Sequence, residues 1–486
     1  MWQLEKAEGY SNLPDVARFI AHLNRPGQAW ASFFEANPTK PIFVGRAPGR
    51  LDLMGGIADY SGSLVLELPL GVATFVAAQA IHQPVFKVVS INQPETGTSA
   101  TVSLSLEELL ACESYEQARQ MLNRESGGEW AAYLAGIWLV LVKEGLATPA
   151  GGVKLLVYSE VPEGKGVSSS AALEVATLQA LSGLFGLSLA GREAALLCQR
   201  VENLVVGAPC GVMDQMTSAC GEAGKLLTLL CQPAELQPLT ALPAQVEVWG
   251  IDSGLRHAVS GADYSSVRVG AFMGYRIIAE LAGLAVTPVQ PGRVKIEDKY
   301  WRGYLANITP SCWETLYCDR LPLTMSGAEF LARYEGITDA VTQVDTERTY
   351  AVRQPTAHPI YEHHRVRLFR HLLQCQPLEE ETLTLLGELM YQSHASYSQC
   401  GLGSNGTDRL VELVRETGLA GGLYGAKITG GGSGGTVAVL SRYGQREVVE
   451  ELARRYYQES SLTITPLLGG SSSGAINFGV ARLSLV

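Results

Sequence analysis

The sequence VPEGKGVSSSAALEVAT at residues 161–177 decides how this chain is interpreted. Its second half consists of strong helix formers, and the serines that precede them are favourable helix N-caps. The apolar segment 153–158 predicts a strand, so the order is strand, glycine-rich loop and helix. Free backbone N–H groups and the positive end of the helix dipole make the start of such a helix a favourable anion site.

The composition of this loop suits a phosphate, but it has a second explanation. Glycines let the backbone approach a phosphate closely, and serine hydroxyls can bind phosphate oxygens or a magnesium ion. The loop is not a Walker A motif, because no G-x-x-x-x-G-K-[ST] string occurs in the chain. An ordinary capped helix after a Ser/Gly loop would produce the same pattern. The loop alone therefore leaves phosphate binding and simple helix capping open.

Two further glycine-rich stretches favour phosphate binding. They are GRAPGRLDLMGGIADY at residues 45–60 and KITGGGSGGT at residues 427–436. Together and in this order, the three motifs resemble those of the GHMP kinase superfamily, whose small-molecule kinases include galactokinase and mevalonate kinase. The first motif is similar to that of galactokinases, and closer still to that of plant-type L-arabinokinases. The resemblance runs from about residue 43 to the C-terminus and is weakest at 286–365.

The resemblance implies an α/β (α+β) fold of two domains, the first similar to ribosomal protein S5 and the second ferredoxin-like. The limits that we expect are an N-terminal helical extension at 1–40, a nucleotide-binding domain at 41–245, and a second domain at 246–486 with an insertion at about 287–365. Other patterns predict a core helix at 130–144, a helix at 187–204, a surface segment at 287–299 and a strand at 462–466. A serine-rich segment at 469–474, with no helix expected after it, receives no role.

Composition narrows the class of protein and its partners. The chain has 486 residues, 47% of them hydrophobic, and a net charge of −11, which argues against a nucleic-acid partner. Its nine cysteines include no C-x-x-C pair, which argues against zinc and against thioredoxin-like chemistry. No apolar run reaches the roughly 18 residues of a membrane span. The odd cysteine count and the lack of a signal peptide fit a cytoplasmic protein. The oligomeric state is not predicted.

Asp214 and Arg50 are the candidate catalytic residues. Asp214 is one acid among small and apolar residues in GAPCGVMDQ, 207–215, where a helix N-cap is an equally good explanation. The segment is similar to the one that carries the catalytic aspartate of galactokinases, which implies that Asp214 accepts the proton of the anomeric hydroxyl. Arg50 matches the arginine of the first motif and would keep that carboxylate ionised. A structural ion pair is the alternative for Arg50, and some members of the superfamily need no aspartate base.

The resemblance implies ATP and Mg²⁺ as cofactors. The residues expected at the ATP phosphates are Gly164, Gly166, Val167, Ser168, Ser169, Ser170 and Ala171. Hard oxygen atoms are the ligands that Mg²⁺ prefers, and the Ser170 hydroxyl (or that of Ser169) and the Glu202 carboxylate are the candidates. Glu202 matches the family glutamate that precedes the catalytic aspartate; without the family it would read as a solvated helix carboxylate. The loop formed by Gly430, Gly431 and Gly432 is expected to close over substrate and phosphates.

Three residues are expected to hold the sugar by analogy with galactokinases. Asp59 matches the aspartate that binds sugar hydroxyls, and Tyr264 matches a tyrosine that contacts the sugar. Gly211 stands where a backbone amide meets a ring hydroxyl.

The first motif also departs from the galactokinase pattern. Galactokinases typically read Gly-Glu-His-Thr-Asp-Tyr where this chain has Gly-Gly-Ile-Ala-Asp-Tyr, so Gly56 and Ile57 replace a Glu-His pair. In the family that glutamate reaches the C6 hydroxyl of galactose. L-Arabinopyranose has the same ring stereochemistry but no C6 group, and would leave that polar pair unsatisfied at a cost. We therefore expect Gly56 and Ile57 to contact substrate.

The expected function is thus an ATP- and Mg²⁺-dependent sugar kinase, a phosphotransferase that converts L-arabinose to L-arabinose 1-phosphate. Two alternatives remain open at this point: a galactokinase, and a non-catalytic galactokinase-like sugar sensor. Ile57 could also be a mere packing substitution. The chain retains Arg50, the serine triplet, Glu202 and Asp214, which favours a working enzyme over a sensor.

Overall fold

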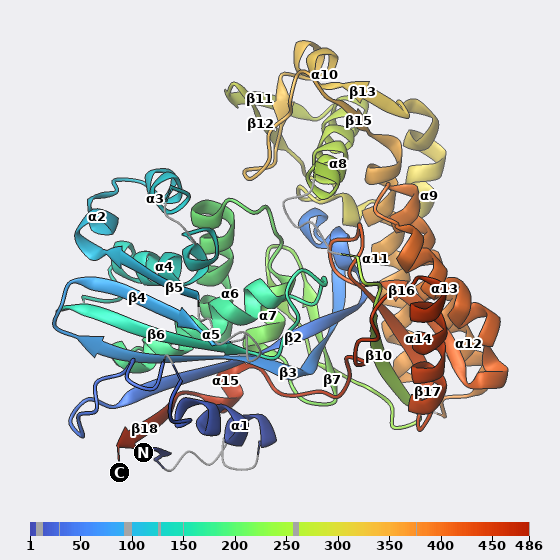
Figure 1. Ribbon diagram of the computed structural model, residues 1–486. Coiled ribbons are helices and arrows are strands. Elements are labelled where there is room, and N and C mark those ends of the chain that lie inside the picture. The colour runs from blue at the N-terminus through green and yellow to red at the C-terminus, as the bar shows by residue number, and fades with distance from the viewer. Residues whose placement is uncertain are drawn as a thin grey trace.

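The computed structural model describes residues 1–5, 13–28, 30–91, 100–124, 128–148, 150–255, 262–375 and 377–485. They form a region around a large twisted sheet and a second region of helices around a smaller sheet, with a group of short strands above both (Figure 1). The two long strands of the large sheet extend from the first region to the second.

The large sheet has ten strands, seven of them in the order β1-β18-β2-β3-β6-β4-β5. In that order they are β1 (Trp2–Leu4), β18 (Ala481–Leu485), β2 (Ile42–Met54), β3 (Leu64–Ile81), β6 (Gly152–Ser159), β4 (Val85–Ser90) and β5 (Ala100–Ser105). β7 (Lys225–Leu230) pairs with β3 and carries β8 (Glu235–Leu236) and β9 (Thr240–Ala241). Among these neighbours only β4 and β6 run parallel within the described residues.

Helices cover both faces of this sheet (Figure 1). One face carries α4 (Gly128–Lys143), α5 (Ser169–Phe185), α6 (Gly191–Arg200) and α7 (Met213–Cys220), with the short helices α2 (Leu106–Ala111) and α3 (Tyr115–Leu122) at its edge. α1 (Pro14–Leu23) lies on the other face, where Phe19 stacks on Phe75 of β3 at 4.9 Å. α4 is apolar around most of its circumference because it is enclosed by the sheet and by other helices, as its sequence predicts.

The second region is built on a three-stranded antiparallel sheet in the order β10 (Val246–Asp252), β17 (Thr436–Arg442), β16 (Leu423–Ile428). Its helices are α11 (Arg353–Gln374), α12 (Glu380–Gln399), α13 (Asn405–Thr417) and α14 (Arg446–Glu459). Above them, α8 (Ala262–Leu281) packs with β11 (Ala285–Gln290), β12 (Gly292–Glu297), β13 (Thr324–Ser326), α10 (Gly327–Tyr334), β14 (Gly336–Ile337) and β15 (Thr349–Ala351). Short turns of helix, α9 (Pro310–Cys312) among them, complete this part.

The segment 287–299 lies at the surface, as expected, mostly in the β11–β12 hairpin, whose register shifts at Pro288. Other local expectations differ from the structure. The helix expected at 187–204 begins at Gly191 and changes into a π-helix at 201–206. No strand forms at 462–466, where the chain pairs with no sheet. A short helix, α15 (Ala475–Phe478), does follow the serine-rich segment.

The expected domain limits remain predictions, but two segments lie outside the units to which those limits assign them. Residues 2–4, expected within a helical extension, form β1 at the edge of the large sheet. Residues 481–485, expected in the second domain, form β18 between β1 and β2. Within the described residues no helix combines the length and apolar character needed to cross a bilayer. All nine cysteines are free thiols.

A buried arginine holds three separate segments together beneath the large sheet. Arg46 of β2 is 1% exposed and donates to Asp15 Oδ2 of α1 from Nε at 2.9 Å and from Nη2 at 2.6 Å. Its guanidinium lies 3.3 Å from Ser472 Oγ and 4.8 Å from the ring centre of Phe478. The Ser472 hydroxyl in turn donates to the Leu70 carbonyl of β3 at 2.7 Å. Through Ser472, the serine-rich segment at 469–474 is therefore bonded to both β2 and β3 of the large sheet.

The Arg46–Asp15 pair predicts a large effect of Asp15→Ala on stability. Removing the carboxylate leaves a buried guanidinium without its counter-charge, which should lower the free energy of unfolding by about 3–5 kcal/mol in urea titrations. Arg18→Ala, on the same helix, is the matched control. Its pair with Glu160 is half exposed on the arginine side, so its removal should cost about 1 kcal/mol or less. Equal losses for the two variants would contradict the assignment.

Candidate active site

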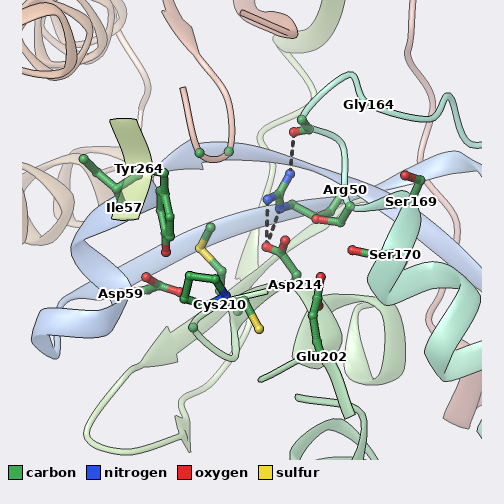
Figure 2. Close-up of a pocket in the computed structure, with 17 residues that line it drawn as sticks. Arg50, Ile57, Asp59, Gly164, Ser169, Ser170, Glu202, Cys210, Asp214 and Tyr264 are labelled. Carbon is green, nitrogen blue, oxygen red and sulfur yellow. Dashed lines mark hydrogen bonds and ion pairs between the residues drawn. The ribbon is translucent and has the colours of Figure 1, made fainter. Parts of the chain in front are cut away.

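A cavity opens at the N-terminal ends of α5 and α7, beside β2, the start of α8 and the loop between β16 and β17 (Figure 2). It is lined by Arg50, Ile57, Asp59, Gly164, Gly166, Ser168, Ser169, Ser170, Glu202, Pro209, Cys210, Gly211, Met213, Asp214, Tyr264, Gly430 and Gly431. Most of the residues expected at a site are thus brought together. Four are not at its wall: Gly56, Val167, Ala171 and Gly432. Pro209, Cys210 and Met213 line it but were not expected.

The glycine-rich loop presents the start of α5 to this cavity. Gly164, Gly166 and Ser168 all adopt positive φ, at 67°, 68° and 62°, which turns the loop sharply into the helix. Contrary to the expectation of a serine cap, the Ser168 side chain makes no capping bond. Its buried hydroxyl has no protein partner. Because a buried hydroxyl without a partner is costly, this atom and the free N–H groups of the helix start fit an anionic ligand.

Arg50 connects this loop to Asp214. Its Nε and Nη2 donate to Asp214 Oδ1 at 3.0 and 2.7 Å, and its Nη1 donates to the Gly166 carbonyl at 2.8 Å (Figure 2). Burial acts to lower the pKa of Arg50, but the charges of Asp214 and Glu67 outweigh it and raise that pKa. The arginine side chain is 2% exposed and that of Asp214 is 23% exposed. Of the pair, the carboxylate is the member that a ligand can reach. Asp214 is the second residue of α7, not its N-cap.

Two other carboxyl groups at the cavity have raised pKa values. Burial and the charge of Asp214 raise the pKa of Asp59 to about 7 and that of Glu202 to about 7. Gln215 Nε2 donates to Glu202 Oε2 at 2.6 Å and to Glu174 Oε2 at 3.2 Å. Glu202 is therefore a buried and positioned carboxyl group, not a solvated one.

Ser170 and Glu202 offer the oxygen donors that a nucleotide-bound magnesium ion prefers. Both line the same cavity, and the Ser170 hydroxyl interacts with the Glu202 carboxyl group. No cluster of three or more His, Cys, Asp or Glu side chains suited to a metal occurs in the described part of the chain. A hydroxyl and a single carboxylate fit an ion whose remaining ligands come from phosphates and water.

The opposite end of the cavity is formed by Asp59, Tyr264 and Gly211 (Figure 2). Gly211 lies so close to Asp59 that a Cβ atom there would be 1.5 Å from Asp59 Oδ2, so no larger residue fits. Arg268 of α8 supports this end from behind: it forms a bidentate pair with Asp339 at 2.7 and 2.8 Å. Its guanidinium lies 5.3 Å from the ring centre of Tyr60. Sequence patterns did not single out Arg268, because a helical arginine normally faces solvent.

The third glycine-rich motif packs directly on the first loop. A Cβ atom on Gly430 would lie 2.7 Å from the Gly166 carbonyl oxygen, and one on Gly435 would lie 2.7 Å from that of Lys165. Lys165 Nζ also pairs with Asp252 Oδ2 of β10 at 2.8 Å. The second region therefore contacts the glycine-rich loop before α5, although closure over a substrate remains a prediction.

Gly56 does not line the cavity, and its expected role as a substrate contact remains a prediction. The space into which its side chain would project holds the hydroxyl of Tyr397, 1.6 Å from an ideal Cβ position. Its neighbour Ile57 does line the cavity, as expected. Tyr397 comes from the middle of α12, where helical periodicity signals only burial, so sequence reasoning missed it.

Comparison with known proteins shows which families the chain resembles. Three family models match the chain: the GHMP kinases N terminal domain at residues 132–222, the GHMP kinases C terminal region at 376–458, and the galactokinase galactose-binding signature at 28–80. The crystal structure of Lactococcus lactis galactokinase complexed with galactose matches with a TM-score of 0.68 at 21% identity, covering 94% of this chain and 99% of that one. The fold expected from the motifs is confirmed.

Relatives in sequence come from the same group. An L-arabinokinase of Arabidopsis thaliana is 46% identical over 493 residues, covering 92% of this chain but 47% of that protein, so the chain spans about half its length. A galactokinase of Chloroflexus aurantiacus is 29% identical, covering 92% of this chain and 95% of that protein. The chain is thus similar to GHMP kinases, and its identity to the L-arabinokinase is higher than its identity to this galactokinase.

Asp59 predicts a pH-dependent stability for the ligand-free protein. Its pKa is raised from 3.8 to about 7 in the folded state, so between these values the folded protein binds a proton that the unfolded chain releases. The free energy of unfolding should then fall by up to about 1.4 kcal/mol per pH unit through this group as the pH rises toward 7. Asp59→Asn, neutral at every pH, should lack this slope in urea unfolding at a series of pH values.

The control for this measurement is Asp319→Asn, whose carboxylate is 96% exposed. It should keep the slope of the parent protein. Parallel profiles for Asp59→Asn and the parent would show that the buried carboxyl does not titrate in this range.

Proposed function

We propose that this chain is an ATP- and Mg²⁺-dependent sugar kinase that phosphorylates the anomeric C1 hydroxyl of L-arabinose. The observation that carries the proposal is the Arg50–Asp214 pair. It lies between the glycine-rich loop and serine triplet at 164–170 (the serine loop) on one side and Asp59 and Tyr264 on the other (Figure 2). A phosphoryl donor and an acceptor sugar bound at these two ends would meet at Asp214. Phosphoryl transfer needs this arrangement because its catalysis depends mainly on positioning and charge stabilisation.

Asp214 is assigned the role of base. As the sugar C1 oxygen bonds to the γ-phosphorus, the bond from that phosphorus to the β–γ bridging oxygen breaks, and ADP leaves with this oxygen. Asp214 accepts the proton of the C1 hydroxyl. Arg50 holds the Asp214 carboxylate by its Oδ1 atom and supplies a fixed positive charge near the transferred phosphoryl group. The guanidinium is itself fixed by the Gly166 carbonyl, so little reorganisation is needed.

The serine loop is assigned to the ATP phosphates and to Mg²⁺. Ser168, with its unpartnered hydroxyl, and the N–H groups at the start of α5 would bind phosphate oxygens. Ser170 and Glu202 would hold the magnesium ion, which when bound neutralises phosphate charge. Glu202 would then act as a carboxylate, so cation binding should compete with its protonation.

The sugar end favours a pentose that lacks an exocyclic hydroxymethyl group. Ile57 presents an apolar side chain to the cavity where galactokinases typically have a polar pair. An apolar wall gives the C6 hydroxyl of galactose no partner, whereas L-arabinopyranose lacks that hydroxyl. The 46% identity to an L-arabinokinase supports the same choice. A sugar kinase would act on small molecules in solution. We therefore propose a cytoplasmic location and no nucleic-acid or membrane partner.

Asp214→Asn should lower turnover by a factor of about 10²–10⁴, because it preserves shape but cannot accept the proton. ADP release in a coupled assay would measure turnover, and calorimetric titration would measure sugar affinity, which should change little. Asp345→Asn, a carboxylate outside the cavity lining, serves as control and should turn over like the parent. Parent-like turnover by Asp214→Asn with unchanged sugar affinity would refute the base assignment.

Side-by-side kinetics with free sugars test the substrate. We expect kcat/KM for L-arabinose to exceed that for D-galactose by about 10–200-fold, the range typical of a pocket that lacks room or partners for one group. The product should be L-arabinose 1-phosphate, identified by NMR. A preference for galactose would make the protein a galactokinase. ADP release with neither sugar, despite sugar binding, would favour the non-catalytic sensor.

A further inference from the structure

The hydroxyl of Tyr397 joins two segments of the cavity wall without lining the cavity itself. Tyr397, in α12, is fully buried. Its hydroxyl accepts a hydrogen bond from the Ile57 N–H at 2.9 Å and donates one to the Gly430 carbonyl at 3.0 Å. Ile57 and Gly430 both line the cavity, one from the first motif and the other from the third. One side chain thus sets the relative position of two motifs that are far apart in the sequence.

The tyrosine ring is held in place from several sides. His358 of α11 meets it edge-on at 5.3 Å between ring centres, and Lys427 Nζ lies 5.3 Å from its ring centre. Lys427 is paired with Asp52 at 2.7 Å, and both side chains are fully buried. Asp52 Oδ1 accepts from the Gly56 N–H at 3.0 Å. These contacts hold the phenol ring in one position, and the Asp52 carboxylate holds the Gly56 backbone in place beside it.

Tyr397 and a side chain at position 56 exclude each other. An ideal Cβ on Gly56 would lie 1.6 Å from Tyr397 Oη, 2.8 Å from its Cζ and 2.6 Å from Asp52 Oδ2. These distances are far below van der Waals contact, so even alanine requires the phenol to move. Gly56 also has φ of +42°, a conformation that glycine adopts readily and other residues adopt at a cost. A glutamate at this position, as in galactokinases, is incompatible with this tyrosine hydroxyl.

We propose that Tyr397 is a positioning residue that determines sugar specificity, by holding Ile57 rigidly against the sugar end of the cavity. The inference rests on the proposed function. With Tyr397 in place, position 56 must be glycine, and the wall beside the sugar is the fixed apolar side chain of Ile57. The cavity then fits a pyranose ring without an exocyclic hydroxymethyl group. The same hydroxyl ties Gly430 to this wall, so sugar selection and the position of the third motif are set together.

Tyr397→Phe removes the shared hydroxyl while keeping the ring. It leaves the Ile57 N–H and the Gly430 carbonyl without this partner, so both segments can shift. We expect kcat/KM for L-arabinose to fall by tenfold or more, while kcat/KM for D-galactose changes less, so that the ratio of the two drops at least about fivefold. The KM for L-arabinose should rise more than the KM for ATP. Tyr391→Phe, on the same helix and outside the cavity lining, is the matched control and should keep the parent ratio.

A double-mutant cycle tests the exclusion directly. Gly56→Ala alone should lose most activity and stability, because its Cβ collides with Tyr397 Oη. The double variant Gly56→Ala/Tyr397→Phe should be more stable than the sum of the two single changes in unfolding free energy predicts, because the atom closest to the added Cβ is gone. This coupling is measured by urea unfolding and does not depend on which sugar is the substrate.

The outcomes separate this inference from the proposed function. Preference of the parent protein for galactose, or no sugar phosphorylation, would overturn the proposed function and with it the specificity role of Tyr397. Preference of the parent for L-arabinose, together with an unchanged ratio in Tyr397→Phe, would overturn the specificity role alone. Additive unfolding energies in the cycle would overturn the exclusion of a side chain at position 56. A lowered ratio combined with positive coupling would support the whole inference.

Discussion

The buried positive charge of Arg50 is the constraint on which the arrangement of the site depends. A guanidinium 2% exposed is tolerated only if carboxylates and carbonyls surround it, and here they are Asp214, Glu67 and the Gly166 carbonyl. Each comes from a different element: α7, β3 and the serine loop. Satisfying one charge therefore brings together the groups to which we assign the phosphoryl donor and the acceptor. Glu67 lies 3.1 Å from Arg50, and burial and the charge of Asp52 raise the pKa of Glu67 well above its usual value.

A second buried pair joins the two halves of the molecule in the same way. Lys427 of β16 and Asp52 of β2 are both fully buried and lie 2.7 Å apart. The Asp52 N–H also donates to Thr429 Oγ1 at 2.7 Å, so the start of the third motif is bonded to the backbone of the first. Separating the two groups would leave an unpaired charge in the protein interior, which is costly. The relative position of the two regions is thus set at the site, rather than at a distant hinge.

The part of the site that could be predicted from sequence is the part made by local motifs. Arg50, Ser170 and Asp214 stand in glycine-rich or small-residue segments, where one polar residue is conspicuous. Tyr397, Gln215 and Arg268 could not be found in this way, because each sits in an ordinary helix and gains its role from a partner far along the chain. The fold shows the same difference between local and long-range features. The core helix α4 was predicted from its composition. The strands β1 and β18 could not be predicted in this way, because they depend on pairing between distant segments.

The position of β18 has a consequence for how the protein forms in the cell. The edge of β2 is covered by a strand from the far end of the chain, and Arg46 lies 426 positions from its contact Ser472. On a ribosome, β2 would present unpaired N–H and C=O groups along this edge until residues 481–485 have been synthesised. Open strand edges of this kind recruit other chains, so nascent molecules carry a transient risk of aggregation up to that point. A chaperone that shields this edge would affect yield without affecting the folded protein.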